Sequence, residues 1–144
     1  MAWKYFDVAK DHMACPCGCG FGANPAEFNY HLMEQLDLLR EMWGAPLALT
    51  SAARCLSHNE SVGGEKHSAH LPDADRQCRA VDFALPGHAF WPTSRIRKEL
   101  IQKANRAGFQ RIGIGKTFLH VDMAAEHGSP GLPEGWWVYG EIRG

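Results

Sequence analysis

The sequence lacks the features that mark a membrane protein, a nucleic-acid-binding protein or a secreted precursor. No apolar run approaches the roughly 20 residues that a membrane-spanning helix needs. The net charge is −1 and basic residues form no run, so no segment attracts nucleic acid or anionic lipid. The N-terminus has no basic start followed by an apolar stretch, so we expect synthesis in the cytoplasm without a signal peptide.

Cysteine occurs in an odd number, which argues against a disulfide scaffold. The five cysteines belong to a chain of 144 residues, long enough to bury an apolar core without cross-links. Cys15, Cys17 and Cys19 are crowded together, and Cys55 is the candidate to join them. The spacing lacks the usual Cys-x-x-Cys of zinc sites, so a structural metal site, a disulfide and free thiols all remain open.

Apolar periodicity and turn residues predict a single α+β domain over residues 1–144. A first helix is predicted to start at Pro25, after Asn24 as its cap, and to end before Gly44. Its apolar stripe consists of Phe28, Leu32, Leu36, Leu39 and Trp43. A short helix is predicted near 58–62 and a longer one over 93–107. Short strands are predicted at 47–51, 80–83, 109–114 and 118–123, and the aromatic tail 135–139 as an edge strand or a groove wall. Strands so closely spaced favour a small, mainly antiparallel sheet with flanking helices.

Two histidines and one aspartate in strand-like contexts form the clearest candidate metal site. They are His70, Asp82 and His120. Imidazole and carboxylate ligands of this kind hold a catalytic zinc that keeps one position open for water. An aspartate on a half-buried strand needs a partner, and a salt bridge to Arg54 or Arg79 is the alternative to a metal. The sequence therefore favours a metal-dependent hydrolase.

Two further charged residues are candidates for the chemistry of this site. Asp122 stands two residues after His120, so both side chains face the same side of a strand. Its carboxylate can act as the general base, or it can orient His120 by accepting a hydrogen bond from the second ring nitrogen. Arg54 follows the strand 47–51, and its guanidinium can hold a substrate carboxylate.

Taken in order, these segments resemble the M15 family of zinc D,D-peptidases, in particular its small single-domain members from phage endolysins and bacterial cell-wall enzymes. The resemblance covers roughly residues 5–125 and rests on Ser51-Ala-Ala-Arg54, His58-Asn59, Val62-Gly-Gly64, Ser68-Ala-His70, Ala80-Val-Asp82 and Phe118-Leu-His120-Val-Asp122. It implies a hedgehog/D,D-peptidase-like fold and one catalytic zinc held by His70, Asp82 and His120. It also implies that Arg54 holds a peptide carboxylate, and we place Ser68 at the substrate beside it.

The sequence departs from the family pattern at two places. The family aspartate stands closer to the first histidine, and residues 72–77 carry the excess here. This inserted loop should rim the cleft, and it brings Asp73 and Asp75 as alternatives to Asp82. Many relatives carry a base two or three residues before the last histidine, where this chain has phenylalanine and threonine. Asp122 is the first substitute candidate for that base, and His67 is the second.

We therefore expect a monomeric zinc metallopeptidase that hydrolyses peptidoglycan stem peptides, as a D-Ala-D-Ala carboxypeptidase or an L-Ala-D-Glu endopeptidase. A phage-type endolysin would reach the cell wall or periplasm after release by a holin or by lysis. Neither a nucleic-acid partner nor membrane insertion is expected. The alternative is a non-catalytic zinc-containing module of the same fold that binds peptidoglycan, because the usual base is missing. A redox or metal-sensing role through the clustered cysteines is a third hypothesis.

Overall fold

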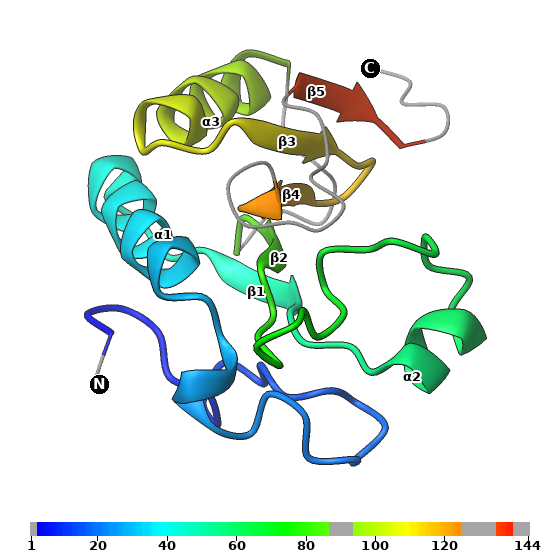
Figure 1. The fold of residues 1–144 in the computed structure, drawn as a ribbon. Helices are drawn as coiled ribbons and strands as arrows, with labels where there is room; N and C mark the ends of the chain where they lie inside the picture. The colour runs from blue at the N-terminus through cyan, green and yellow to red at the C-terminus, as the bar shows by residue number, and fades with distance from the viewer. Residues whose placement is uncertain (1–2, 87–93, 125–134, 140–144) are drawn as a thin grey trace.

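The computed structural model describes residues 3–86, 94–124 and 135–139, which form three α-helices, one 3-10 turn and a five-stranded sheet (Figure 1). The helical elements are η1 (Pro25–Glu27), α1 (Tyr30–Trp43), α2 (Leu56–Ser61) and α3 (Ser94–Arg106). The strands are β1 (Ala48–Ser51), β2 (Ala80–Ala84), β3 (Arg111–Ile114), β4 (Leu119–Asp122) and β5 (Gly135–Val138). The predicted α+β class is confirmed. Among the described helices, none combines the length and apolarity needed to cross a lipid bilayer.

The strands lie in the order β1-β2-β4-β3-β5. Each neighbouring pair from β1 to β3 is antiparallel, whereas β5 runs parallel to β3. The sheet is therefore mainly antiparallel, as predicted, and the aromatic tail is its edge strand. This order places β2 and β4 at the centre, where both neighbours fix the register of each strand.

The first helix begins later than the sequence predicts. Asn24 does cap a helical turn by accepting the N–H of Ala26, but that turn is the short η1. The chain then becomes extended at Phe28, which forms a β-bridge with Cys78. The α-helix starts only after Asn29, whose side chain accepts the N–H of Leu32 at 2.9 Å. The long-range bridge thus overrides a local capping signal that would have started α1 at Pro25.

The sheet buries one face against the helices and turns the other toward the candidate site. Val81 and Phe83 of β2 are fully buried, and side chains alternate along a strand, so Asp82 lies on the opposite face. The same alternation in β4 separates buried Val121 from His120. Figure 1 shows α1 and α3 side by side along the sheet and α2 on its other side. The core includes Leu32, Leu36, Leu39, Leu100, Ala104, Ile112 and Leu119.

Candidate active site

The sheet register brings the predicted metal ligands together. Asp82 on β2 lies directly opposite His120 on β4. His70 comes from the loop before β2, which is tied to the sheet because Arg54 N donates to His70 O at 3.1 Å and Arg79 N donates to Ala69 O at 3.0 Å. One ligand atom from each of His70, Asp82 and His120 lies within 4.8 Å of the others. Segments far apart in the sequence thus meet at one point on the open face of the sheet.

The ring of His70 is held in one orientation. Its Nδ1 lies 2.6 Å from the carbonyl oxygen of Ala52. A carbonyl oxygen only accepts, so Nδ1 carries the hydrogen and Nε2 presents its lone pair toward Asp82 Oδ1, 3.2 Å away. Burial lowers the pKa of His70, although Asp82 opposes this shift. The neutral imidazole that results is the form that binds a metal ion.

His120 is held between two carboxylates. Its Nδ1 lies 2.8 Å from Asp82 Oδ1, and its Nε2 lies 2.7 Å from Asp122 Oδ2. Burial disfavours the imidazolium, but the hydrogen bonds to Asp122 and Asp82 outweigh it and raise the pKa of His120 to about 9. Burial likewise opposes ionisation of Asp82, but the hydrogen bond from His120 is the main contact that holds its pKa below the ordinary value. The carboxylate of Asp82 is therefore ionised and available as an oxygen ligand.

Asp122 is built into a buried network by both of its oxygens. Oδ2 accepts from His120, while Oδ1 accepts from Arg111 Nε at 2.8 Å and from the backbone N–H of Ala124 at 2.9 Å. Burial opposes its ionisation, but the hydrogen bond from His120 outweighs burial, and the pKa of Asp122 is lowered. A carboxylate with engaged oxygens and a lowered pKa is a weak proton acceptor. Of the two roles predicted for Asp122, the geometry favours the orientation of His120.

All seven residues predicted for the site line one cleft, whose volume is about 680 Å³: Arg54, His67, Ser68, His70, Asp82, His120 and Asp122. Arg54 presents a buried Nε that has no hydrogen-bond partner within the described part of the chain. Ser68 is half-buried, and its Oγ accepts the backbone N–H of His70 at 3.2 Å. His67 is exposed on the cleft wall formed by residues 62–70. A guanidinium with an unpaired donor thus shares a cleft with a three-residue ligand set.

The family model described as Peptidase M15 matches residues 4–122, which include this whole ligand set. The chain belongs to the peptidase M15 family. Membership confirms the resemblance seen in the sequence motifs and supports a zinc peptidase of the peptidoglycan-acting kind in general; it does not specify a branch of the family. No curated protein matches the chain.

The donor set fits the zinc ion expected of an M15 peptidase. Zinc takes imidazole nitrogen and carboxylate oxygen ligands, and catalytic sites use three protein ligands. His70 Nε2, Asp82 Oδ1 and His120 Nδ1 would supply that set, with the ion taking the place of the proton on His120 Nδ1. The second nitrogen of each ring is held by Ala52 O or Asp122, as in well-ordered zinc sites.

The inserted loop of this M15 chain lies away from the cleft. None of residues 71–79, all of which the structure describes, lines the cleft, so the expectation that the loop forms its rim is wrong. Asp73 instead accepts the backbone N–H groups of Asp75 and Gln77 at 2.9 Å and closes the loop on itself. The loop is drawn toward η1, where Arg76 Nε lies 3.1 Å from Glu27 Oε2. Asp82, and neither Asp73 nor Asp75, reaches the histidines.

Three cleft residues that were not among the predicted site residues lie close to His120 or Asp122. Trp137 and Tyr139 lie beside His120, with ring centroids 5.4 and 6.2 Å from its own. Gly113 makes this possible, because a Cβ there would come within 2.6 Å of Tyr139 and 2.8 Å of Trp137. The tail is therefore both the edge strand and the groove wall that were offered as alternatives. Arg111 lies opposite Asp122 in the register, and its guanidinium carbon lies 4.6 Å from the Trp137 ring centre. The position of Arg111 beside Asp122 depends on the pairing of β3 with β4, which the sequence does not show.

Proposed function

We propose that the protein is a zinc-dependent peptidase that hydrolyses peptide bonds in the stem peptides of bacterial peptidoglycan. The observation that carries this proposal is the shared cleft, in which His70, Asp82 and His120 converge beside the unpaired donor of Arg54. Membership of the peptidase M15 family supports the same conclusion.

The residues of the cleft have three different roles: they bind the metal, orient its histidine ligands and bind the substrate. His70, Asp82 and His120 would hold the zinc, which when bound polarises the scissile carbonyl and makes water a competent nucleophile near neutral pH. Ala52 O and Asp122 keep the two rings from rotating. Arg54 binds a carboxylate of the stem peptide, because its planar guanidinium matches a carboxylate with paired hydrogen bonds.

The proton acceptor is assigned to the wall formed by residues 62–70. Phe118, at a position where many relatives carry the base, packs against Tyr139 with ring centroids 5.4 Å apart. Asp122 is engaged by both oxygens. His67 and Glu65 are exposed on the cleft wall, and imidazole and carboxylate both accept protons. We propose His67 as the acceptor, and a His67→Gln variant that keeps zinc but loses turnover would support this role.

Mass spectrometry of defined muropeptides tests the function directly. Zinc-loaded protein should cleave them, and a sample treated with a chelator should not. The fragment masses distinguish loss of a terminal D-Ala from cleavage between L-Ala and D-Glu. His70→Ala should abolish cleavage, whereas His31→Ala, which changes an exposed histidine on α1, should leave it intact. Cleavage that survives complete metal removal would contradict the proposal.

A second function is a peptidoglycan-binding module that has lost catalysis. The specific observation in its favour is that Thr117 and Phe118 stand where many relatives carry the base. This function predicts intact muropeptides together with retention of the zinc-loaded protein on sacculi. Arg54→Ala should weaken that retention. Metal-dependent cleavage would exclude this function.

A further inference from the structure

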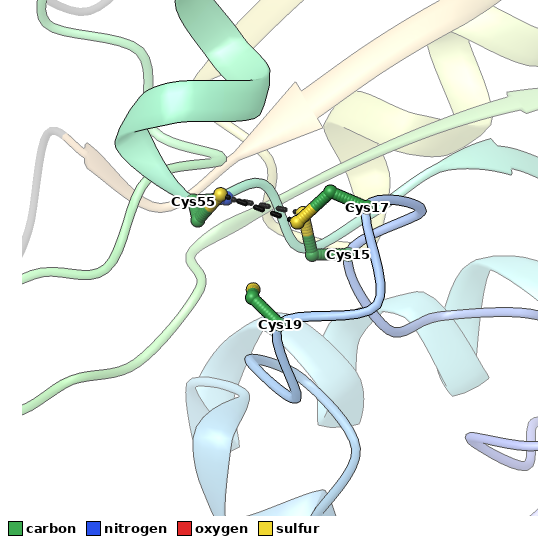
Figure 2. A group of neighbouring side chains, drawn as sticks. All are labelled: Cys15, Cys17, Cys19 and Cys55. Carbon is green, nitrogen blue, oxygen red and sulfur yellow. Dashed lines mark hydrogen bonds between the residues drawn. The ribbon is translucent and has the colours of Figure 1, made fainter.

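Four cysteine side chains from two distant segments converge outside the cleft. Cys15, Cys17 and Cys19 lie on the loop before η1, and Cys55 stands at the start of α2. Figure 2 shows the four side chains pointing toward one another. Their sulfur atoms all lie within 4.8 Å of one another, and none of the four residues lines the cleft. We call this group the cysteine tetrad.

The sulfur spacing matches a metal site better than a disulfide. Cys15 Sγ lies 3.4 Å from Cys17 Sγ, and Cys17 Sγ lies 3.5 Å from Cys55 Sγ. A disulfide would bring two sulfurs to about 2.05 Å. Four thiolates at a Zn–S distance of about 2.3 Å, arranged as a tetrahedron, are separated by about 3.8 Å. The four sulfurs thus lie close to the positions that a tetrahedral ion requires.

Backbone N–H groups already point at two of the sulfurs. Cys55 N donates to Cys15 Sγ, and His58 N donates to Cys55 Sγ, both at 3.4 Å. Hydrogen bonds of this kind stabilise the thiolate form, which is the form that binds metals. The second of them also caps α2, so the tetrad is part of the start of that helix.

We propose that Cys15, Cys17, Cys19 and Cys55 bind a second Zn²⁺ as a closed, structural tetrathiolate site. Four protein ligands leave no position for water, so this ion would take no part in hydrolysis. Four soft thiolates in tetrahedral arrangement favour zinc over the harder magnesium and calcium ions. The ion would be separate from the one expected at His70, Asp82 and His120.

The position of the tetrad indicates what the ion does. Between residues 3 and 24 the described chain contains no helix or strand, and its backbone hydrogen bonds are mostly local turns within the segment. The ion would tie this segment to Cys55, the residue that follows the candidate substrate-binding Arg54. Ala53 N also donates to Met13 O at 3.1 Å across the same junction. With an ion bound, the tetrad would thus hold the N-terminal segment against the chain at Cys55, next to Arg54 of the cleft.

Zinc content of protein purified under reducing conditions tests the proposal without any activity measurement. The unmodified chain should hold two zinc ions. A Cys17→Ser/Cys19→Ser variant should keep only the ion in the cleft, and a His70→Ala/His120→Ala variant should keep only the ion in the tetrad. Cys78→Ala, which removes a buried thiol outside the tetrad, should still hold two ions. A His70→Ala/His120→Ala chain that is folded but free of zinc would overturn the proposal.

X-ray absorption at the zinc edge gives a second test on the unmodified chain, so no variant has to fold. The proposal predicts sulfur scatterers at about 2.3 Å, averaging two per zinc when both sites are filled. A zinc shell made only of nitrogen and oxygen would overturn it. Iron in place of zinc, or a protein mass lowered by a disulfide among the four cysteines, would overturn it as well.

Discussion

The two candidate metal sites of this protein are built in opposite ways. Asp82 and His120 lie on paired central strands, so the ladder between β2 and β4 fixes their separation before any ion binds. The cysteine tetrad lies mainly on a loop, where only scattered hydrogen bonds hold Cys15, Cys17 and Cys19. The first site is preformed by the fold, whereas the second is expected to help form the fold around it.

The ligand chemistry follows the same division. Two imidazoles and a carboxylate leave room for water and face a cleft, which is what hydrolysis needs. Four thiolates fill a tetrahedron and face no cleft, which suits a structural ion. Loss of the ion from the cleft should therefore abolish peptide hydrolysis and leave the sheet folded. Loss of the ion from the cysteine tetrad should leave hydrolysis in place but make the N-terminal loop less ordered.

The largest expected effect comes from removing one ligand of the cleft. His70→Ala should lower the rate of muropeptide cleavage by about a thousandfold or more, equivalent to about 4 kcal/mol of transition-state stabilisation. Circular dichroism should still show the folded sheet. Cys17→Ser, the matched change in the tetrad, should keep turnover within about tenfold at low temperature but lower the unfolding temperature. Equal loss of turnover in both variants would contradict the assignment of a catalytic ion to the cleft and a structural ion to the tetrad.

A substitution of Asp122 tests whether zinc affinity in the cleft depends on the hydrogen bond that orients His120. Asp122→Asn should weaken zinc binding by about 10–100-fold, because the amide orients His120 less well than the carboxylate does. Turnover of the zinc-saturated variant should change much less, and competition with a fluorescent chelator measures the affinity. Asp73→Asn, in the loop outside the cleft, serves as the control. Unchanged zinc affinity with a large loss of turnover would restore Asp122 as the general base.

The candidate ligands of the cleft could be predicted from the sequence because Asp82 and His120 lie in short strands with a local pattern, and His70 follows the short motif Ser68-Ala69. His120 and Asp122 share a face by simple alternation, and the structure joins them by a hydrogen bond. The fold class followed from the same short strands. Arg111 and Trp137 could not be assigned in this way, since their positions depend on how β3 pairs with β4 and β5.

The two wrong predictions have a common physical cause. The start of α1 and the course of the inserted loop both depend on the bridge between Phe28 and Cys78. That contact joins segments about fifty residues apart, whereas caps and apolar periodicity report only on neighbours along the chain. The cysteine tetrad shows the same limit, because the spacing of Cys15, Cys17 and Cys19 could not show whether Cys55 lies beside them.

Hydrogen exchange measures the difference in order between the two sites. On removal of both metals, amides of residues 14–23 should exchange at least about tenfold faster, since the loop loses the ion that ties it to Cys55. Amides of β2 and β4 should keep their protection, because the strand ladder does not depend on an ion. Mass spectrometry of peptic fragments before and after chelation gives both values. Similar acceleration in the strands would show that the cleft site is not preformed.

The smallest expected effect concerns the packing of the cysteine-bearing loop, at Gly22, against Ala53. Gly22 and Gly18 both have positive φ, at 84° and 82°, so alanine is strained at either position. At Gly22 a Cβ would also come within 2.4 Å of Ala53 Cβ, whereas at Gly18 it would meet nothing within 4 Å. Gly22→Ala should therefore lower the free energy of unfolding by about 1 kcal/mol more than Gly18→Ala does. Urea denaturation of the zinc-loaded proteins measures this difference. Equal losses would mean that the loop shifts freely against Ala53, and the tetrad would then not hold it in one place.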